Sequence, residues 1–165
     1  MRRLLLLAVL ALAACDKPTP AEKAADDARD IAMVEAAQHN YGPPVALDPS
    51  PITLADRERA RLIGAGCSFE AEGQSDPVLI AQPKHAVMKL GRELTAFASD
   101  NGSTQLPLGT WAHYVGKEGS LRINKAAGEG GLGGQGGVEW QATLTVTDQH
   151  DRTVYSSPGR LRCGA

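Results

Sequence analysis

The chain has 165 residues, of which 42% are hydrophobic and 22% are charged, a balance typical of one globular domain with accessory segments. Its formal net charge is −2, and loss of a leader containing Arg2 and Arg3 changes it to −4 (−2 minus 2), which argues against nucleic acid as a partner. The chain contains two tryptophans and two phenylalanines, so we expect a small and mostly aliphatic core.

The N-terminus has the three parts of a secretory signal peptide. Arg2 and Arg3 form a short positive segment, residues 4–12 are continuously apolar, and two alanines follow. The apolar segment is much shorter than the roughly 20 residues that a membrane-spanning helix needs. The pattern therefore predicts a signal peptide over residues 1–14.

The end of this leader carries a recognisable motif. The run Leu12, Ala13, Ala14 and Cys15 resembles the lipobox of bacterial lipoproteins, such as the small lipoproteins of proteobacteria. The resemblance implies cleavage before Cys15 and a diacylglyceryl thioether on its sulfur, and two or more acyl chains hold a protein firmly in a bilayer. It thus implies a lipid-anchored protein of the cell envelope that faces the periplasm, at either the inner or the outer membrane. The alternative is an ordinary cleaved signal peptide followed by an unmodified cysteine.

Residues 15–51 have the composition of a tether, because alanine, aspartate, lysine and proline dominate and aromatic residues are scarce. Thr19 and Glu22 form a capping box with proline at the first helical position, which predicts a helix over residues 21–39. The apolar face of this helix is thin, so we interpret it as a solvated spacer rather than a partner-binding helix. The prolines that follow it predict an extended, stiff segment.

A β domain is expected over residues 52–165. It opens with a second capping pair, Thr53 and Asp56, which predicts a short helix over residues 54–63, with Gly64 at its C-terminal end.

The clearest strand pattern covers residues 138–147. Five apolar residues alternate there with five polar ones, which predicts a half-buried strand of an antiparallel sheet. Turns are expected at residues 100–102 and 157–159 and a polar link at 148–151. Short strands with glycine and proline turns indicate a mainly β fold, a small antiparallel β-sandwich or barrel. Further strands are expected at residues 67–70, 78–81, 86–90, 93–98, 111–115, 121–124, 153–156 and 161–163.

The remaining two cysteines predict a disulfide between Cys67 and Cys163, because an exported chain lives where disulfides persist. They lie in the first and last predicted strands. A zinc site or a redox pair is the alternative, but the two cysteines are far apart in sequence, with no CxxC and no flanking histidine.

No pattern indicates catalysis, a metal or a cofactor. The glycine-rich run over residues 128–137 contains GxGxxG by spacing, but a strand follows it rather than a helix, so we expect a loop. No GxSxG is present, and the four histidines form no ligand pair. We therefore expect a protein that is not an enzyme, with a small hydrolase as the weakest alternative.

One stretch concentrates residue types that are enriched at recognition surfaces. Trp111, His113, Tyr114 and Lys117 form this candidate binding surface, although Trp111 and Tyr114 also suit the sparse aromatic core. A lipid-anchored β domain with a bridging disulfide is similar to the membrane-bound inhibitors of c-type lysozyme. The order of the tryptophan and tyrosine differs from that family, so no inhibitory residue is carried over.

The function predicted from the sequence is therefore binding. A tethered β domain would bind an envelope protein or peptidoglycan, with inhibition of a wall-degrading enzyme as the alternative.

Overall fold

The computed structural model describes residues 18–39, 41–133 and 136–164. The chain divides into two units along its sequence, with the boundary between Pro43 and Pro44. This boundary comes earlier than the predicted end of the tether at residue 51. The first unit contains one helix, α1 (Pro20–His39), where a helix over residues 21–39 is predicted. Thr19 and Glu22 form the expected capping contacts, since the Thr19 amide donates to the Glu22 carboxylate at 2.8 Å.

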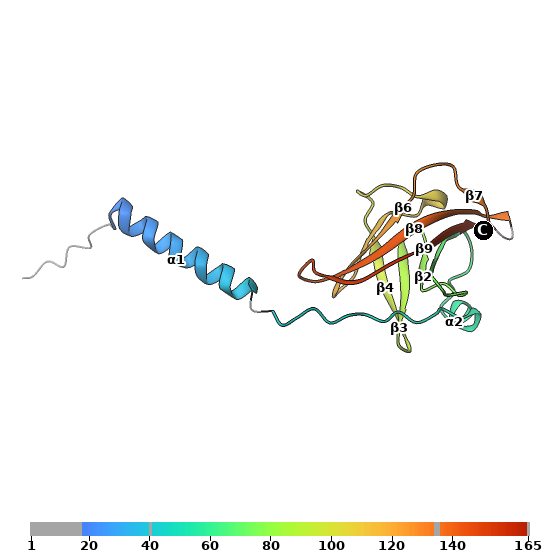
Figure 1. The fold of residues 1–165 in the computed structure, drawn as a ribbon, viewed down its shortest axis with the longest axis horizontal. Helices are drawn as coiled ribbons and strands as arrows, with labels where there is room; N and C mark the ends of the chain where they lie inside the picture. Colours follow the sequence, from blue (N-terminus) through green and yellow to red (C-terminus); the bar gives the residue numbers. More distant parts are fainter. Residues whose placement is uncertain (1–17, 40, 134–135, 165) are drawn as a thin grey trace, which may run out of the picture. The chain divides into compact units, whose positions relative to one another are not determined.

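The second unit is a closed antiparallel β-barrel of eight strands with one additional strand (Figure 1). Each barrel strand pairs with the next barrel strand along the chain, and the last pairs with the first. The two-residue β7 pairs only with β8, within the glycine-rich run. The predicted mainly β fold is therefore confirmed, in its barrel form. The strands are β1 (Gly66–Ala71), β2 (Leu79–Ala81), β3 (His85–Leu90), β4 (Glu93–Ser99), β5 (His113–Val115), β6 (Gly119–Lys125), β7 (Gly131–Leu132), β8 (Val138–Asp148) and β9 (Thr153–Gly164).

The barrel closes where β1 pairs with β9, and the disulfide lies on this seam. Cys67 is the register partner of Cys163, with their Cα atoms 4.0 Å apart and the two sulfurs bonded. The predicted disulfide is thus present, between the first and last strands of the barrel.

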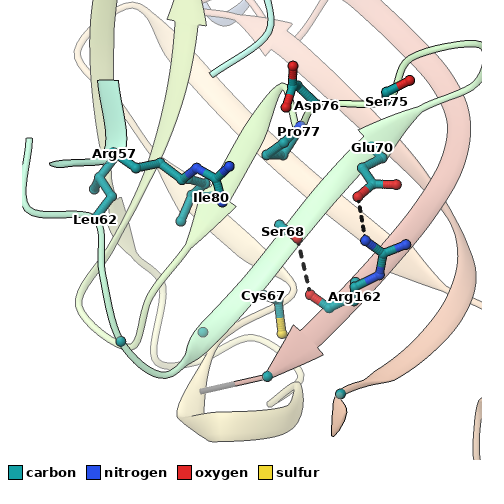
Figure 2. Close-up of a pocket in the computed structure, with 14 residues that line it drawn as sticks. Arg57, Leu62, Cys67, Ser68, Glu70, Ser75, Asp76, Pro77, Ile80 and Arg162 are labelled. Carbon is teal, nitrogen blue, oxygen red and sulfur yellow. Dashed lines mark hydrogen bonds and ion pairs between the residues drawn. The ribbon is translucent and has the colours of Figure 1, made fainter. Parts of the chain in front are cut away.

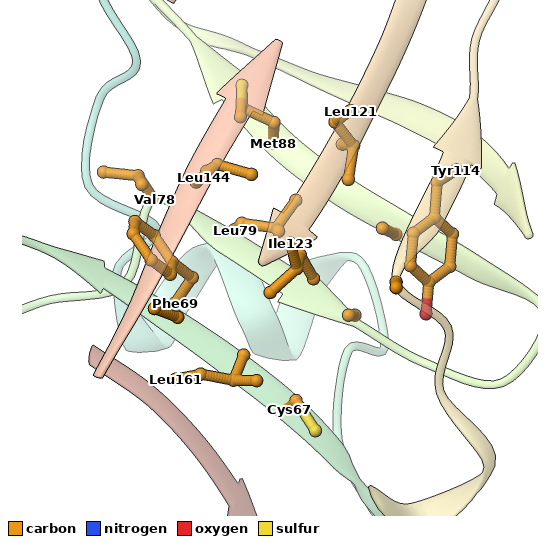
Figure 3. Close-up of a cluster of buried hydrophobic side chains, with 14 of the residues drawn as sticks. Cys67, Phe69, Val78, Leu79, Met88, Tyr114, Leu121, Ile123, Leu144 and Leu161 are labelled. Atoms are coloured by element: carbon orange, nitrogen blue, oxygen red, sulfur yellow. The ribbon is translucent and has the colours of Figure 1, made fainter. Parts of the chain in front are cut away.

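The interior of the barrel is filled by its own side chains, as expected for eight strands. Successive strand residues point to opposite faces, so one alternating set from each strand points inward. Figure 3 shows these apolar side chains meeting between the strands. The largest are Phe69, Leu79, Met88, Tyr114, Leu121, Ile123, Leu144 and Leu161, each fully buried.

A second apolar cluster covers the outer face of β2 and β3. Ile52 and Leu62 pack there against Ile80 and Val87, and all four are buried. Strand β2 is consequently buried on both faces. This cluster holds the segment around α2 (Leu54–Arg59) against the barrel.

Helix α2 ends at Arg59, so the predicted end at residue 63 is wrong. Arg61 adopts the left-handed conformation with φ of 55°, and the Leu62 amide donates to the Arg57 carbonyl at 2.8 Å. The Arg61 amide also donates to the Glu58 carbonyl, which completes a Schellman motif before Gly64 is reached. Burial of Leu62 favours this early ending.

The turn predicted at residues 157–159 is also wrong, because β9 runs through it. Pro158 is paired with Thr143 of β8, whereas pairing with β1 begins only at Gly159. On the β1 side the Pro158 carbonyl accepts from the Glu72 amide at 3.0 Å, just beyond the last paired residue of β1, and a residue without an N–H is tolerated at this end of the ladder. An irregularity between Val146 and Thr147 of β8 shifts the register of the long hairpin that β8 and β9 form.

A short 3-10 turn, η1 (Pro107–Gly109), lies between β4 and β5. It packs near the disulfide, since the Thr110 hydroxyl donates to the Pro107 carbonyl at 2.8 Å and contacts the Cys67 sulfur at 3.3 Å.

Candidate functional site

A polar groove of about 450 Å³ lies on the outer surface of the barrel, beside the seam of β1 and β9. Figure 2 shows Arg57 on one side of it and the Glu70–Arg162 pair on the other. The groove is lined by Arg57, Leu62, Gly64, Gly66, Cys67, Ser68, Glu70, Ser75, Asp76, Pro77, Ile80, Gly137, Arg162 and Gly164.

Arg57 comes from α2 and is held in place by the contacts of that helix. Thr53 caps the helix, and Asp56, the residue before Arg57, forms an ion pair with Lys89 of β3 at 2.6 Å. This lysine, with help from the Thr53 cap, lowers the pKa of Asp56 from 3.8 to about 2. Arg57 itself does not share in the pair, and its side chain extends over Ile80 into the groove (Figure 2).

The Arg57 guanidinium has no hydrogen bond or ion pair with any residue that the structure describes. Its Nε atom is buried from solvent and lacks a partner in that part of the chain. Buried polar groups in native proteins nearly always have a partner, and an unsatisfied one costs about 1–3 kcal/mol. The two terminal nitrogens of the guanidinium are not among these buried atoms and also have no partner in the described chain, so they are the donors that a ligand in the groove can reach.

The other wall is an ion-pair network on the outer faces of three neighbouring strands. Both oxygens of the buried Glu70 are occupied, by Arg162 at 2.8 Å and Arg160 at 3.0 Å. Arg162 also reaches Glu139 at 2.9 Å. The Glu139 carboxylate raises the pKa of Arg162 above its ordinary value, so this cation stays charged at every physiological pH. The network is internally satisfied and gives the groove a rigid wall.

The charges on the lining residues balance. Arg57 and Arg162 are cationic, whereas Glu70 and Asp76 are anionic. Asp76 and Ser75 follow β1 in an exposed connection, and the structure assigns neither side chain a hydrogen bond or ion pair among the described residues. Among the described residues, the groove thus offers one cation without a partner and several acceptors without one, which suits a ligand that combines a single negative charge with N–H donors.

Metal binding has no support in residues 18–39, 41–133 and 136–164, where no three His, Cys, Asp or Glu side chains come together as ligands. Asp100 lies 2.9 Å from the Nδ1 atom of His113, and this hydrogen bond lowers the pKa of the Asp100 carboxyl. That contact joins two residues, His113 on β5 and Asp100 in the connection before β5.

The four residues of the predicted binding surface have separate places. Tyr114 is fully buried, and its hydroxyl accepts from the Trp111 amide at 2.9 Å and donates to the Gln82 carbonyl at 3.1 Å. Burial raises the pKa of Tyr114. Trp111 is half-buried against the core, His113 is mostly covered, and Lys117 is exposed in the turn between β5 and β6. Tyr114 is therefore a core residue, and the four do not form one exposed patch.

The lipidation site predicted at Cys15 lies outside the described residues, as does the whole leader. Within the described helices, none combines the length and the apolar character needed to cross a membrane.

Sequence reasoning did not find the groove, although one signal for its network existed. A bridge between Cys67 and Cys163 in antiparallel strands places Glu70 opposite Arg160, three residues from each cysteine. Arg57 gave no signal, because one arginine in a highly charged short helix looks like a solvated side chain.

Comparisons of the chain with protein-family models, with curated proteins and with solved structures find no match.

Proposed function

We propose that this chain is a lipid-anchored protein of the cell envelope, attached through Cys15, whose barrel binds an envelope protein or peptidoglycan in the periplasm. The lipobox over residues 12–15 supports the anchor, and the disulfide is consistent with an oxidising compartment. Residues 18 and 19, α1 and the segment that follows it provide a spacer between anchor and barrel.

The observation that carries the binding function is the groove at the β1–β9 seam. The barrel interior is packed with apolar side chains, so recognition by this domain falls to its outer surface. On that surface, the groove joins a preorganised wall to an arginine whose Nε atom is buried without a partner in the described chain. Small-molecule and peptide sites typically combine a concave shape with a few oriented polar groups of this kind.

The anchor is tested by membrane fractionation of the wild-type chain and of Cys15→Ser. We expect the wild type to carry a lipid at Cys15 by mass spectrometry and to sediment with membranes, and we expect the variant to remain unprocessed by the lipoprotein pathway. A wild-type protein with an unmodified Cys15 would refute the anchor.

The binding function is tested by photo-crosslinking in intact cells. A benzophenone amino acid replaces Ser75 in the groove, and the same replacement at the exposed Lys117 is the control. A single partner captured from position 75 and not from 117 supports binding through the groove, and a captured wall-degrading enzyme that loses activity would identify the partner as an inhibited enzyme. Equal, nonspecific capture from both positions would contradict a binding role for this face.

A further inference from the structure

The groove has the properties of a site for one particular chemical group. Among the lining residues that the structure describes, Arg57 is the cation without a partner, and its guanidinium is planar, permanently charged and able to donate two parallel hydrogen bonds to a carboxylate. In the described part of the chain no carboxylate fills this role, because the neighbouring Asp56 is already occupied by Lys89 at 2.6 Å.

The remaining lining residues restrict what the carboxylate is attached to. Asp76 also lines the groove, and its carboxylate has no partner in the described chain, so a doubly charged ligand such as a phosphate would meet stronger repulsion than a single carboxylate. Ser75 and Asp76 instead offer acceptors without a partner in the described chain, which match the amide N–H groups or the ammonium of a peptide. The volume of about 450 Å³ lies in the lower part of the range of small-ligand sites and suits a few residues.

The fixed position of the helix that carries Arg57 indicates a recognition site rather than an arginine exposed by chance. Arg57 is positioned by the Thr53 cap, by the Asp56–Lys89 pair and by the buried cluster of Ile52 and Leu62. The backbone that carries Arg57 is therefore fixed before a ligand arrives, and less entropy is lost on binding than if the helix had to form or dock.

We infer that the groove binds the free C-terminal carboxylate of a short peptide, with Arg57 as the residue that contacts it. This inference rests on the proposed binding function and specifies the ligand of the same site. Both a protein C-terminus and a wall peptide carry this group, and they differ in the chirality of the terminal residue.

The experiment uses the processed protein purified in detergent, with four probes: trialanine of L or D configuration, each as the free acid and as the C-terminal amide. Binding is followed by calorimetry and by the NMR signal of the Arg57 Nε–H group. We expect a free acid to bind and to shift this signal, and we expect its amide to bind about ten- to a hundredfold more weakly, as the loss of a charge-assisted hydrogen bond predicts. Preference for the L acid assigns a protein terminus, and preference for the D acid assigns a wall peptide.

Two variants test the role of Arg57. Arg57→Gln should weaken binding of the free acid to the level of the amide, and Arg57→Lys should recover part of it because charge is kept and the paired donors are lost. Arg59→Gln is the matched control, since Arg59 is on the same helix, does not line the groove, is 75% exposed and among the described residues makes only a long ion pair of 3.6 Å with Asp56. Arg57→Gln should unfold at about the same denaturant concentration as the wild type, because no described partner is lost and an amide atom takes the position of Nε.

The inference is overturned if acid and amide bind equally, if Arg57→Gln binds the acid as the wild type does, or if no probe moves the Arg57 signal. These outcomes leave the fractionation and crosslinking results untouched, so failure of the ligand assignment is distinguishable from failure of the proposed function.

Discussion

Reduction of the Cys67–Cys163 disulfide should lower the free energy of unfolding by about 4.7 kcal/mol at 25 °C. The cysteines are separated by 96 residues, so the bridge closes nearly the whole barrel into one covalent loop. In the chain-entropy model the bridge lowers the conformational entropy of the unfolded chain by about 2.1 cal/mol/K plus 1.5R ln 96, which is about 15.7 cal/mol/K. Small domains are typically stable by about 5–15 kcal/mol, so the reduced barrel would be near the limit of folding.

The measurement is urea denaturation with and without a reductant, followed by tryptophan fluorescence. Reduction is preferable to substitution because the two buried side chains and their contact with Thr110 keep their volume. A variant with alanine at both positions is the control, and reductant should not change its midpoint. If reduction lowers the free energy of unfolding by less than about 1 kcal/mol, the entropic account of this seam is refuted.

Two further predictions concern the groove wall and the glycine-rich run. Lys89 holds the pKa of Asp56 at about 2 in the folded chain, against 3.8 ordinarily. The unfolded chain therefore takes up more protons between these two values, and the free energy of unfolding falls as the pH drops from 4 to 2. In denaturation experiments Asp56→Asn should show a shallower fall over this interval, and an unchanged pH profile would contradict the role given to Asp56. Gly130→Ala should destabilise the barrel by about 1–2 kcal/mol from its left-handed backbone alone, and more because an added Cβ lies 2.6 Å from the Trp140 ring. Gly128→Ala, where an added Cβ meets open space, should show only the backbone cost in the same thermal unfolding assay.

The longer strands could be predicted from the sequence because they carry a period-two pattern, whereas β2 is a short apolar run that is buried on both faces. In β8 the inward residues Ala142, Leu144 and Val146 are buried, as the alternation indicates. The predicted strand over residues 121–124 lies within the longer β6, whose ends carry glycine and lysine and show no alternation. Patterning thus identified the elements, and their ends depended on pairing partners that only the closed barrel supplies.

The errors have the same physical origin. Pro158 and Gly159 indicate a turn locally, yet pairing of β9 with β8 along its whole length outweighs that preference. Gly64 indicates a helix end, yet burial of Leu62 against Ile80 favours an earlier one, at Arg59, with Arg61 as the left-handed residue that follows it. In both cases tertiary contacts override local propensity, and those contacts join residues that are distant in sequence.

The candidate site depends still more on distant contacts, which explains why sequence reasoning placed the binding surface elsewhere. Arg57, Glu70 and Arg162 come from three segments that meet only because β9 returns to β1. Glu70 and Arg162 are satisfied by that meeting, whereas Arg57 is left with a buried Nε atom and no partner in the described chain. A replacement that removed this polar atom without leaving a void should make the barrel more stable, so Arg57 contributes a cost to folding rather than a gain. A ligand carboxylate on the guanidinium would offset that cost, and the stability of Arg57→Met relative to the wild type measures it, because methionine places a methyl group where arginine carries Nε.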